Sequence, residues 1–237
     1  MTIDPQILSV GPLWYVVFLL SLTCHEAAHA LIAWMGGDPT AYYGGQVSLN
    51  PIPHIRREPF GTVIVPILSY VLGGWMIGWG SAPYSPNWQR RYPRRAAWMA
   101  LAGPMANVTL MILAALGIRI GMALGALSPG RRSFAHVAVS TSTGPTEGLA
   151  IFLSILFSLN LLLAAFNLLP IPPLDGNAAV GIVLPQGLAR RFVEFSHNRS
   201  FALLGLLLGW SVFGYVFSPL FVAALRLLYL GTTGLGI

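Results

Sequence analysis

The sequence predicts an all-α, polytopic membrane protein with about four to six transmembrane helices, and two observations carry this prediction. Hydrophobic residues make up 55% of the 237 positions and charged residues only 8%, whereas soluble domains carry about a quarter charged residues. The apolar residues also gather into runs long enough to cross a bilayer, which takes about 20 residues. We expect residues 1–237 to form a single integral-membrane domain without an attached soluble domain.

The first third of the chain predicts one spanning helix and two shorter elements. Residues 11–35 are apolar and, at 1.5 Å per residue, would form a helix about 37 Å long. Two glycines followed by Asp-Pro end this run. Residues 40–50 contain Tyr-Tyr-Gly-Gly and Gln-Val-Ser-Leu and predict a small β-hairpin. Residues 59–80 are apolar but interrupted by a proline and a glycine pair, which favours a re-entrant or interfacial segment.

The rest of the chain predicts further membrane helices joined by polar loops. Residues 96–127 form a long apolar helix candidate, and residues 128–146, rich in Ser, Thr and Gly, indicate a loop. Residues 147–169 indicate a spanning helix that ends at three closely spaced prolines, because proline cannot continue a regular helix. Residues 186–200 indicate a polar loop. Residues 201–231 are apolar but interrupted by Ser-Pro, and are compatible with one kinked helix or two short ones.

The charge distribution indicates membrane flanks and excludes a nucleic-acid partner. The net charge is +6, and every cation is an arginine. The arginines occur in pairs between apolar runs, as expected beside a lipid bilayer, at Arg56-Arg57, Arg90-Arg91, Arg94-Arg95, Arg131-Arg132 and Arg190-Arg191. Cys24 is the only cysteine, which excludes an internal disulfide and a cysteine-based zinc site.

The sequence His25-Glu26-Ala-Ala-His29 is an H-E-x-x-H motif within the first apolar run. Residues four positions apart lie on one face of a helix, so both imidazoles can share a metal ion. Glu26 between them lies within reach of a metal-activated water and can act as its general base. The alternative is that these are two solvated histidines and a surface glutamate without a function. The apolar setting argues against it, because an ionisable group inside an apolar span usually marks a functional site.

A catalytic zinc site normally has three protein ligands, so one is missing from this motif. The sequence Asn167-Leu-Leu-Pro-Ile-Pro-Pro-Leu-Asp175-Gly follows a spanning helix directly. Its prolines predict irregular backbone at membrane depth, which is tolerated only where it is buried in protein or lines a cavity. Alone, Asp175 would suit an ordinary Asp-Gly turn; together with the two histidines it is the best candidate for the third ligand. A His₂Asp set can also hold iron or cobalt.

These two motifs in this order resemble the site-2 protease family of intramembrane zinc metalloproteases, in a compact form without a PDZ or CBS domain. Two further segments are similar to family members, residues 48–66 and residues 102–107. One departure is Trp79-Gly-Ser-Ala-Pro83, which lacks the lysine found in many relatives. That difference concerns substrate engagement and regulation rather than the metal site.

The resemblance implies a role for each matching residue. His25, His29 and Asp175 would bind one Zn²⁺ per chain, and Glu26 would be the catalytic base. Asn167 would lie near the substrate backbone or the oxyanion. His54 would either assist the site or only cap a loop. Outside these roles, Asn107 is interpreted as a hydrogen bonder between helices.

The resemblance also implies a substrate class and a reaction. The chain would hydrolyse peptide bonds within or next to transmembrane helices, during regulated intramembrane proteolysis of membrane-anchored proteins such as anti-sigma factors or remnant signal peptides. An extended substrate segment could pair with residues 40–50 by β-addition. Two alternatives stay open: a non-proteolytic, zinc-binding membrane scaffold or chaperone, and a transporter with a broken helix at residues 167–176.

Membrane topology follows from parity and charge. His29 lies near the exit end of its helix and Asp175 lies just beyond the exit end of residues 147–169, so both ends must face the same side. The chain must therefore cross the membrane an odd number of times between these two helices. Residues 96–127 supply one crossing, so residues 59–80 must not cross. Of the arginines between the apolar runs, one side then holds nine and the other holds Arg131 and Arg132, a split that the positive-inside rule favours. We expect an outside N-terminus in a bacterial or archaeal plasma membrane, with the active site toward the cytoplasm.

Overall fold

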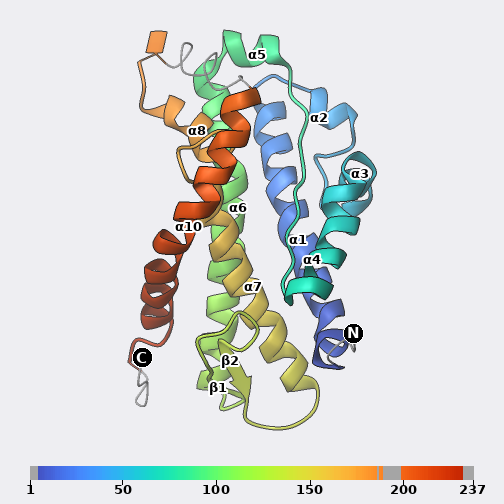
Figure 1. Ribbon diagram of the computed structural model, residues 1–237, viewed down its shortest axis with the longest axis vertical. Coiled ribbons are helices and arrows are strands. Elements are labelled where there is room, and N and C mark those ends of the chain that lie inside the picture. The colour runs from blue at the N-terminus through green and yellow to red at the C-terminus, as the bar shows by residue number, and fades with distance from the viewer. Residues whose placement is uncertain (1–4, 186, 189–198, 232–237) are drawn as a thin grey trace.

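The structure, a computed structural model, describes residues 5–185, 187–188 and 199–231. Within these ranges four helices are long and apolar enough to cross a membrane, which confirms the predicted all-α polytopic class. They run roughly along the long axis of the molecule (Figure 1), and they are α1 (Pro5–Met35), α6 (Pro93–Ala123), α7 (Pro145–Asn167) and α10 (Arg199–Leu228).

Helices α1, α6 and α7 pack against one another and form the core. Small residues of these helices are buried, among them Ala30 of α1 and Ala97 of α6. Larger buried side chains such as Phe18 of α1 and Ile155 of α7 belong to one hydrophobic core cluster. The last helix, α10, packs against α7 (Figure 1) and continues through Pro219. Most of the region 201–231 is therefore one long helix and not two short ones.

The β-hairpin predicted at residues 40–50 is wrong in its position. That region begins with the short helix α2 (Thr40–Tyr43). Asp38 accepts hydrogen bonds from the backbone N–H of Thr40, at 3.1 Å, and from its hydroxyl, which forms a local turn where this helix begins. Gly45, with φ of 72°, then turns the chain away. The Tyr-Gly-Gly pattern therefore marks a helix end and not a strand turn.

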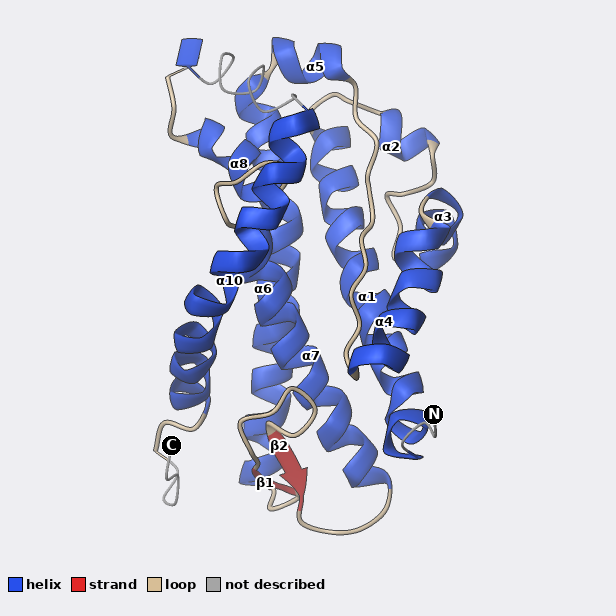
Figure 2. Cartoon of the chain, in the orientation of Figure 1, coloured by secondary structure: helices blue, strands red, loops and turns tan. Residues whose placement is uncertain are grey.

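The two strands lie instead in the region expected to be a loop. β1 (Leu127–Pro129) pairs antiparallel with β2 (Ala138–Ser140), with Leu127 opposite Ser140. The backbone N–H of Ala138 donates to Ser154 Oγ at 3.0 Å, which fixes the hairpin to α7. Figure 2 shows both strands at one end of the molecule, opposite the end that carries α2 (Thr40–Tyr43) and α5 (Pro86–Arg91).

Residues 59–80 enter and leave on the same side, as predicted. After α3 (Pro51–Arg57), a π-helical turn η1 (Phe60–Ile64) and α4 (Val65–Gly73) run down beside α1, and an extended segment returns to α5 (Figure 1). The backbone N–H of Trp79 donates to Gly61 O at 3.1 Å, so the two ends of the segment meet. The helical part, residues 60–73, is about 21 Å long and too short to cross a bilayer.

The chain beyond α7 is irregular, as its prolines predict. α7 ends at Asn167, and the peptide between Pro172 and Pro173 is cis. Two short helices follow, α8 (Asp175–Ala179) and the 3₁₀ turn η2 (Val180–Ile182). Most of the predicted polar loop 186–200, including Arg190 and Arg191, lies outside the described residues.

Candidate metal centre

Helix α1 places the two histidines of the motif side by side. The Nε2 atoms of His25 and His29 are 3.0 Å apart, and the two rings meet edge to face with centroids 4.6 Å apart. Both residues are buried, at 5% and 7% exposure, because α6 and the loop after α7 cover this face of α1. The i, i+4 spacing has therefore produced two convergent nitrogen donors inside the helix bundle.

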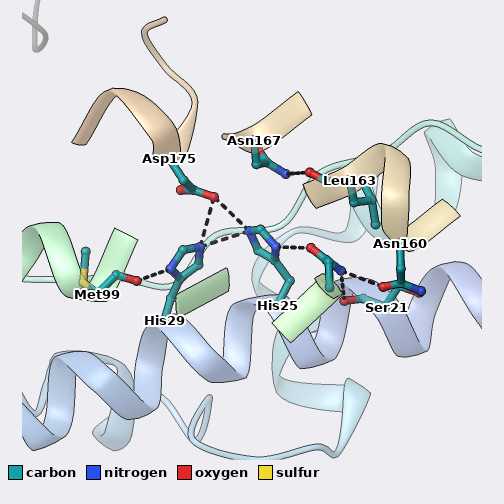
Figure 3. Close-up of polar contacts among 9 residues, drawn as sticks. Ser21, His25, His29, Met99, Asn160, Leu163, Asn167 and Asp175 are labelled. Carbon is teal, nitrogen blue, oxygen red and sulfur yellow. Dashed lines mark hydrogen bonds and ion pairs between the residues drawn. The ribbon is translucent and has the colours of Figure 1, made fainter. Parts of the chain in front are cut away.

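Asp175 completes a triangle of donor atoms. Its Oδ2 lies 3.0 Å from His25 Nε2 and 3.3 Å from His29 Nε2. The irregular chain after α7 brings the carboxylate over the two imidazoles, as Figure 3 shows. Across the described residues these three side chains form the one group of three or more His, Cys, Asp or Glu close enough to hold a metal ion.

The other nitrogen of each imidazole is fixed by a hydrogen-bond acceptor. His29 Nδ1 donates to the backbone carbonyl of Met99 at 2.7 Å, and His25 Nδ1 donates to Asn107 Oδ1 at 2.6 Å. Both acceptors lie on α6. A proton at Nδ1 leaves the Nε2 lone pair directed into the triangle, and this arrangement is usual for metal-binding histidines.

The triangle requires a cation at its centre. Two Nε2 atoms and one carboxylate oxygen lie within 3.3 Å of one another, and lone pairs this close are stable only around a proton or a metal ion. Burial alone would raise the pKa of Asp175. When protons rather than a metal ion occupy the triangle, attraction to a protonated His29 and hydrogen bonds from both imidazoles outweigh burial and hold this pKa well below its usual range. The carboxyl group is then ionised, which is the form in which a carboxylate binds a metal ion.

Gly103 of α6 leaves the space that this centre needs. A Cβ atom at residue 103 would lie 2.6 Å from His25 Nε2 and closer still to His29 Nε2. Any other residue would thus occupy the position toward which the lone pairs point. Two imidazoles, a carboxylate and a space kept free by glycine fit a divalent metal ion such as zinc.

Glu26 lies under the returning segment of the re-entrant element. The residue is 5% exposed, and a Cβ on Gly80 would lie 2.7 Å from its Cγ and 2.8 Å from its Oε1. Glycine at position 80 therefore lets the extended backbone pass directly over the carboxylate. The general-base candidate is therefore next to the candidate metal ligands in sequence and is covered by the returning segment.

The two other predicted site residues, Asn167 and His54, make their hydrogen bonds away from the cluster of His25, His29 and Asp175. Asn167 Nδ2 donates to the carbonyl of Leu163 one turn back in α7, at 3.1 Å, and Figure 3 shows the amide directed along its own helix. His54 is 3% exposed in α3, and its Nε2 contacts the carbonyl of Ser48 at 3.1 Å. This contact corresponds to the loop-capping alternative for His54. Within the described part of the chain, neither residue hydrogen-bonds to the three clustered side chains.

The residues outside α1 that shape the site were not identified from the sequence. Gly103 and Gly80 have no functional side chain, so their roles are visible only from the atoms that lie close to them in the structure. Asn107 does join helices as expected, but it also bonds directly to His25, and Asn160 of α7 lies behind it at 2.8 Å. Two asparagines inside apolar helices were the available signal, because buried amides in such helices need partners.

Comparison with known proteins agrees with this geometry. Residues 13–209 match the family described as peptidase family M50. The chain is 34% identical over 191 residues to the protein named "Putative zinc metalloprotease YwhC" of Bacillus subtilis, a match covering 79% of this chain and 76% of that protein. It is 32% identical over 180 residues to "Putative zinc metalloprotease Rip2" of Mycolicibacterium smegmatis, covering 73% of this chain and 60% of the relative.

The Rip2 protein of Mycobacterium tuberculosis is 33% identical over 166 residues, and the match covers 69% of this chain and 54% of that relative. No solved structure matches the chain significantly. The matched region includes both histidines of the motif, Glu26 and Asp175. With most of its length matched and these side chains brought together in one buried cluster, the chain belongs to peptidase family M50.

Proposed function

We propose that this chain is a zinc-dependent metalloendopeptidase that hydrolyses peptide bonds within or next to transmembrane helices. His25, His29 and Asp175 hold the zinc ion, and Glu26 is the general base. The single observation that carries the proposal is the buried triangle of these three ligands with Glu26 beside it. Membership of a peptidase family supports the reaction class, and the chemistry of the donor set supports zinc.

The depth of the site supports a substrate inside the membrane. His25 lies about 15 Å from the end of α1 at Met35, at 1.5 Å per residue. The two histidines therefore lie within the length of a spanning helix, and Asp175 reaches them from the irregular chain after α7. A peptide bond that reaches them must come from a segment that is itself at or near membrane depth, and it must leave its helical conformation because a helix hides its amides.

The proposed reaction is hydrolysis with a shared proton. Bound zinc supplies Lewis acidity that makes water nucleophilic near neutral pH and polarises the scissile carbonyl. Glu26 takes one proton from the attacking water as the new C–O bond forms at the carbonyl carbon. It then passes that proton to the leaving nitrogen as the C–N bond breaks. Asn167 is the proposed hydrogen-bond donor to the oxyanion, which requires its amide to turn from the carbonyl of Leu163.

An apolar cavity that the returning segment connects to the site supports a hydrophobic substrate. It has a volume of about 720 Å³ and lies between α1, α7, α10, the loop of the hairpin and the returning segment of the re-entrant element. Met76, Ile77 and Gly78 form one wall, and the same segment continues to Gly80 over Glu26. Aromatic residues dominate the rest of the lining, including Trp14, Trp75, Phe166, Trp210, Phe213 and Phe217.

The extended residues next to Glu26 are those of this returning segment. Pairing of a substrate with residues 40–50, expected from the sequence, is not supported, because that region starts as the helix Thr40–Tyr43 and forms no strand. Membrane-anchored regulators, for example anti-sigma factors, and remnant signal peptides are the proposed substrates, by resemblance to the family.

The arginine distribution supports an active site toward the cytoplasm. Arg90, Arg91 and Arg95 lie where α1 ends and α6 begins, and Arg95 donates to the carbonyl of Gly36 at 3.0 Å. Arg131 and Arg132 lie beside the hairpin at the opposite end. The arginine-rich end is the cytoplasmic one under the positive-inside rule, which places the N-terminus outside in a bacterial plasma membrane.

The proposal is tested by comparing cells that produce the wild-type chain with cells that produce Glu26→Gln. New protein termini in the membrane fraction are mapped by mass spectrometry. We expect cleavages within or beside transmembrane segments that occur only with the wild-type chain, while both proteins purify with zinc. Identical termini in both cell types, with zinc bound to both proteins, would overturn the peptidase and favour the non-proteolytic scaffold.

A further inference from the structure

We propose that Asn107 and Asn160 form a relay of hydrogen bonds that fixes the tautomer of His25 and presents its Nε2 lone pair to the metal. The two asparagines are positioning residues, since neither reaches the metal site itself. The inference rests on the proposed metal site and adds residues from two other helices to it.

The relay begins at His25 and crosses the bundle. His25 Nδ1 is 2.6 Å from Asn107 Oδ1, so an α1 side chain is held by α6. Asn107 Nδ2 in turn donates to Asn160 Oδ1 at 2.8 Å, which joins α6 to α7. Asn107 and Asn160 are both fully buried. Figure 3 shows this line of contacts running from the imidazole away from Asp175.

The far end of the relay is anchored on backbone carbonyls, which can only accept, and on the Ser21 hydroxyl, whose proton is already donated to such a carbonyl. Asn160 Nδ2 donates to the carbonyl of Leu156 at 2.8 Å and to Ser21 Oγ at 2.9 Å. The Ser21 hydroxyl donates to the carbonyl of Val17 at 2.7 Å, and its own carbonyl accepts a second, longer bond from Asn107 at 3.4 Å. A backbone carbonyl has no proton to give, so the direction of every bond in the relay is determined.

This fixed direction decides which nitrogen of His25 carries the proton. Asn160 must present Oδ1 to Asn107 because its amide nitrogen is used by two acceptors. Asn107 must then present Nδ2 to Asn160 and Oδ1 to His25. An acceptor facing Nδ1 requires a proton there, which leaves the lone pair of Nε2 free for the metal.

The two histidines are held by different means. His29 Nδ1 is fixed by the carbonyl of Met99, which cannot turn around. His25 faces a side-chain amide, and an amide could present either its oxygen or its nitrogen. A relay is needed only for His25, and the structure supplies one at this histidine. The relay thus uses three fully buried polar side chains, Ser21, Asn107 and Asn160. In addition to joining helices, these side chains determine which nitrogen of His25 carries the proton.

The test measures zinc affinity in purified protein by competition with a chelator. Asn107→Leu should weaken zinc binding by about 10- to 100-fold, the usual effect of losing the partner of a ligating histidine. Asn160→Leu should weaken it less, because Asn107 stays but is no longer oriented. The double variant should bind zinc as Asn107→Leu does, since Asn160 acts only through Asn107.

Three further measurements separate positioning from folding. Asn160→Asp keeps an acceptor oxygen for Asn107 and should retain an affinity near wild type. Ser154→Ala is the matched control, because Ser154 is also a fully buried polar residue of α7 but, among the residues that the structure describes, it bonds to Ala138 and Ala150 and not to the relay. Its zinc affinity should equal that of the wild type. The visible spectrum of the Co²⁺-loaded protein should change in Asn107→Leu and stay unchanged in Ser154→Ala.

The outcomes distinguish the relay from the metal site. Equal zinc affinity in wild type and Asn107→Leu would overturn the relay and leave the proposed metal site standing. Fully additive losses in the double variant would also overturn it, because Asn160 would then act independently of Asn107. A wild-type protein that binds no zinc would refute the metal site itself.

Discussion

Replacing Gly103 by alanine adds one methyl group at the centre of the proposed zinc site. The new Cβ would lie 2.6 Å from His25 Nε2, whereas real Cβ atoms essentially never approach other atoms below 3.0 Å. The imidazole of His29 is even closer. Both rings would have to move, yet their Nδ1 atoms are held by Asn107 and by the carbonyl of Met99. Metal ligands must stay within about 0.5 Å of their working positions.

We therefore expect Gly103→Ala to weaken zinc binding by about 100-fold or more, since the change disturbs both ligands and their partners together. The assay is chelator competition on protein purified in detergent. Gly117→Ala is the matched control on the same helix, because its Cβ would meet only the flexible end of Leu153, at 3.1 Å. Unchanged zinc affinity in Gly103→Ala would refute the placement of the metal between the histidines and α6.

Further predictions concern the elements around the site. Gly80→Ala would press on the carboxylate of Glu26, so kcat should fall by at least about tenfold, while zinc content, measured by atomic absorption, stays at the wild-type level. Gly205→Ala would push α10 against the carbonyl of Pro172 in the loop before Asp175. It should lower both Tm and zinc affinity, whereas Gly209→Ala, whose Cβ would meet only ordinary contacts, should change neither. A fall in zinc content in Gly80→Ala, or equal Tm values for the two α10 variants, would contradict these assignments.

The histidine motif could be predicted because it depends on residue spacing along one helix. The re-entrant segment could be predicted because it depends on the number of membrane crossings between two helices. Two histidines four residues apart must share a helix face, and the structure places their Nε2 atoms 3.0 Å apart. The parity of crossings required that residues 59–80 return to the side they leave, and the contact between Trp79 and Gly61 shows that they do. Asp175 was predicted as the third ligand from the prolines before it and from its pairing with the two histidines, and the structure brings its carboxylate next to both of them.

The position of the hairpin could not be predicted, because short strands are selected by their partners. The Tyr-Gly-Gly pattern at residues 42–45 resembles a turn between strands, but these residues end the short helix Thr40–Tyr43 instead, and Asp38 hydrogen-bonds to the first residue of that helix. β2 forms where α7 supplies Ser154 as a partner for the N–H of Ala138. That contact joins residues 16 positions apart in different elements and has no signature in the local sequence.

The residues that support the candidate metal site from other helices could not be predicted, for the same reason. Gly103 and Asn107 lie on α6, and Asn160 lies on α7, far from the motif in sequence. Their roles depend on how three helices face one another, which a single sequence does not specify. Asn107 was interpreted as joining helices, and the hydrogen bond to His25 adds a second function to that contact.

The most direct test of the account is the zinc content of the purified protein, wild type against Asp175→Ala. The geometry predicts bound zinc in the wild type, and a loss or a large weakening of zinc binding without Asp175, because its Oδ2 lies 3.0 Å and 3.3 Å from the two imidazole nitrogens. Full zinc affinity in Asp175→Ala would contradict the three-ligand site and would require another third ligand.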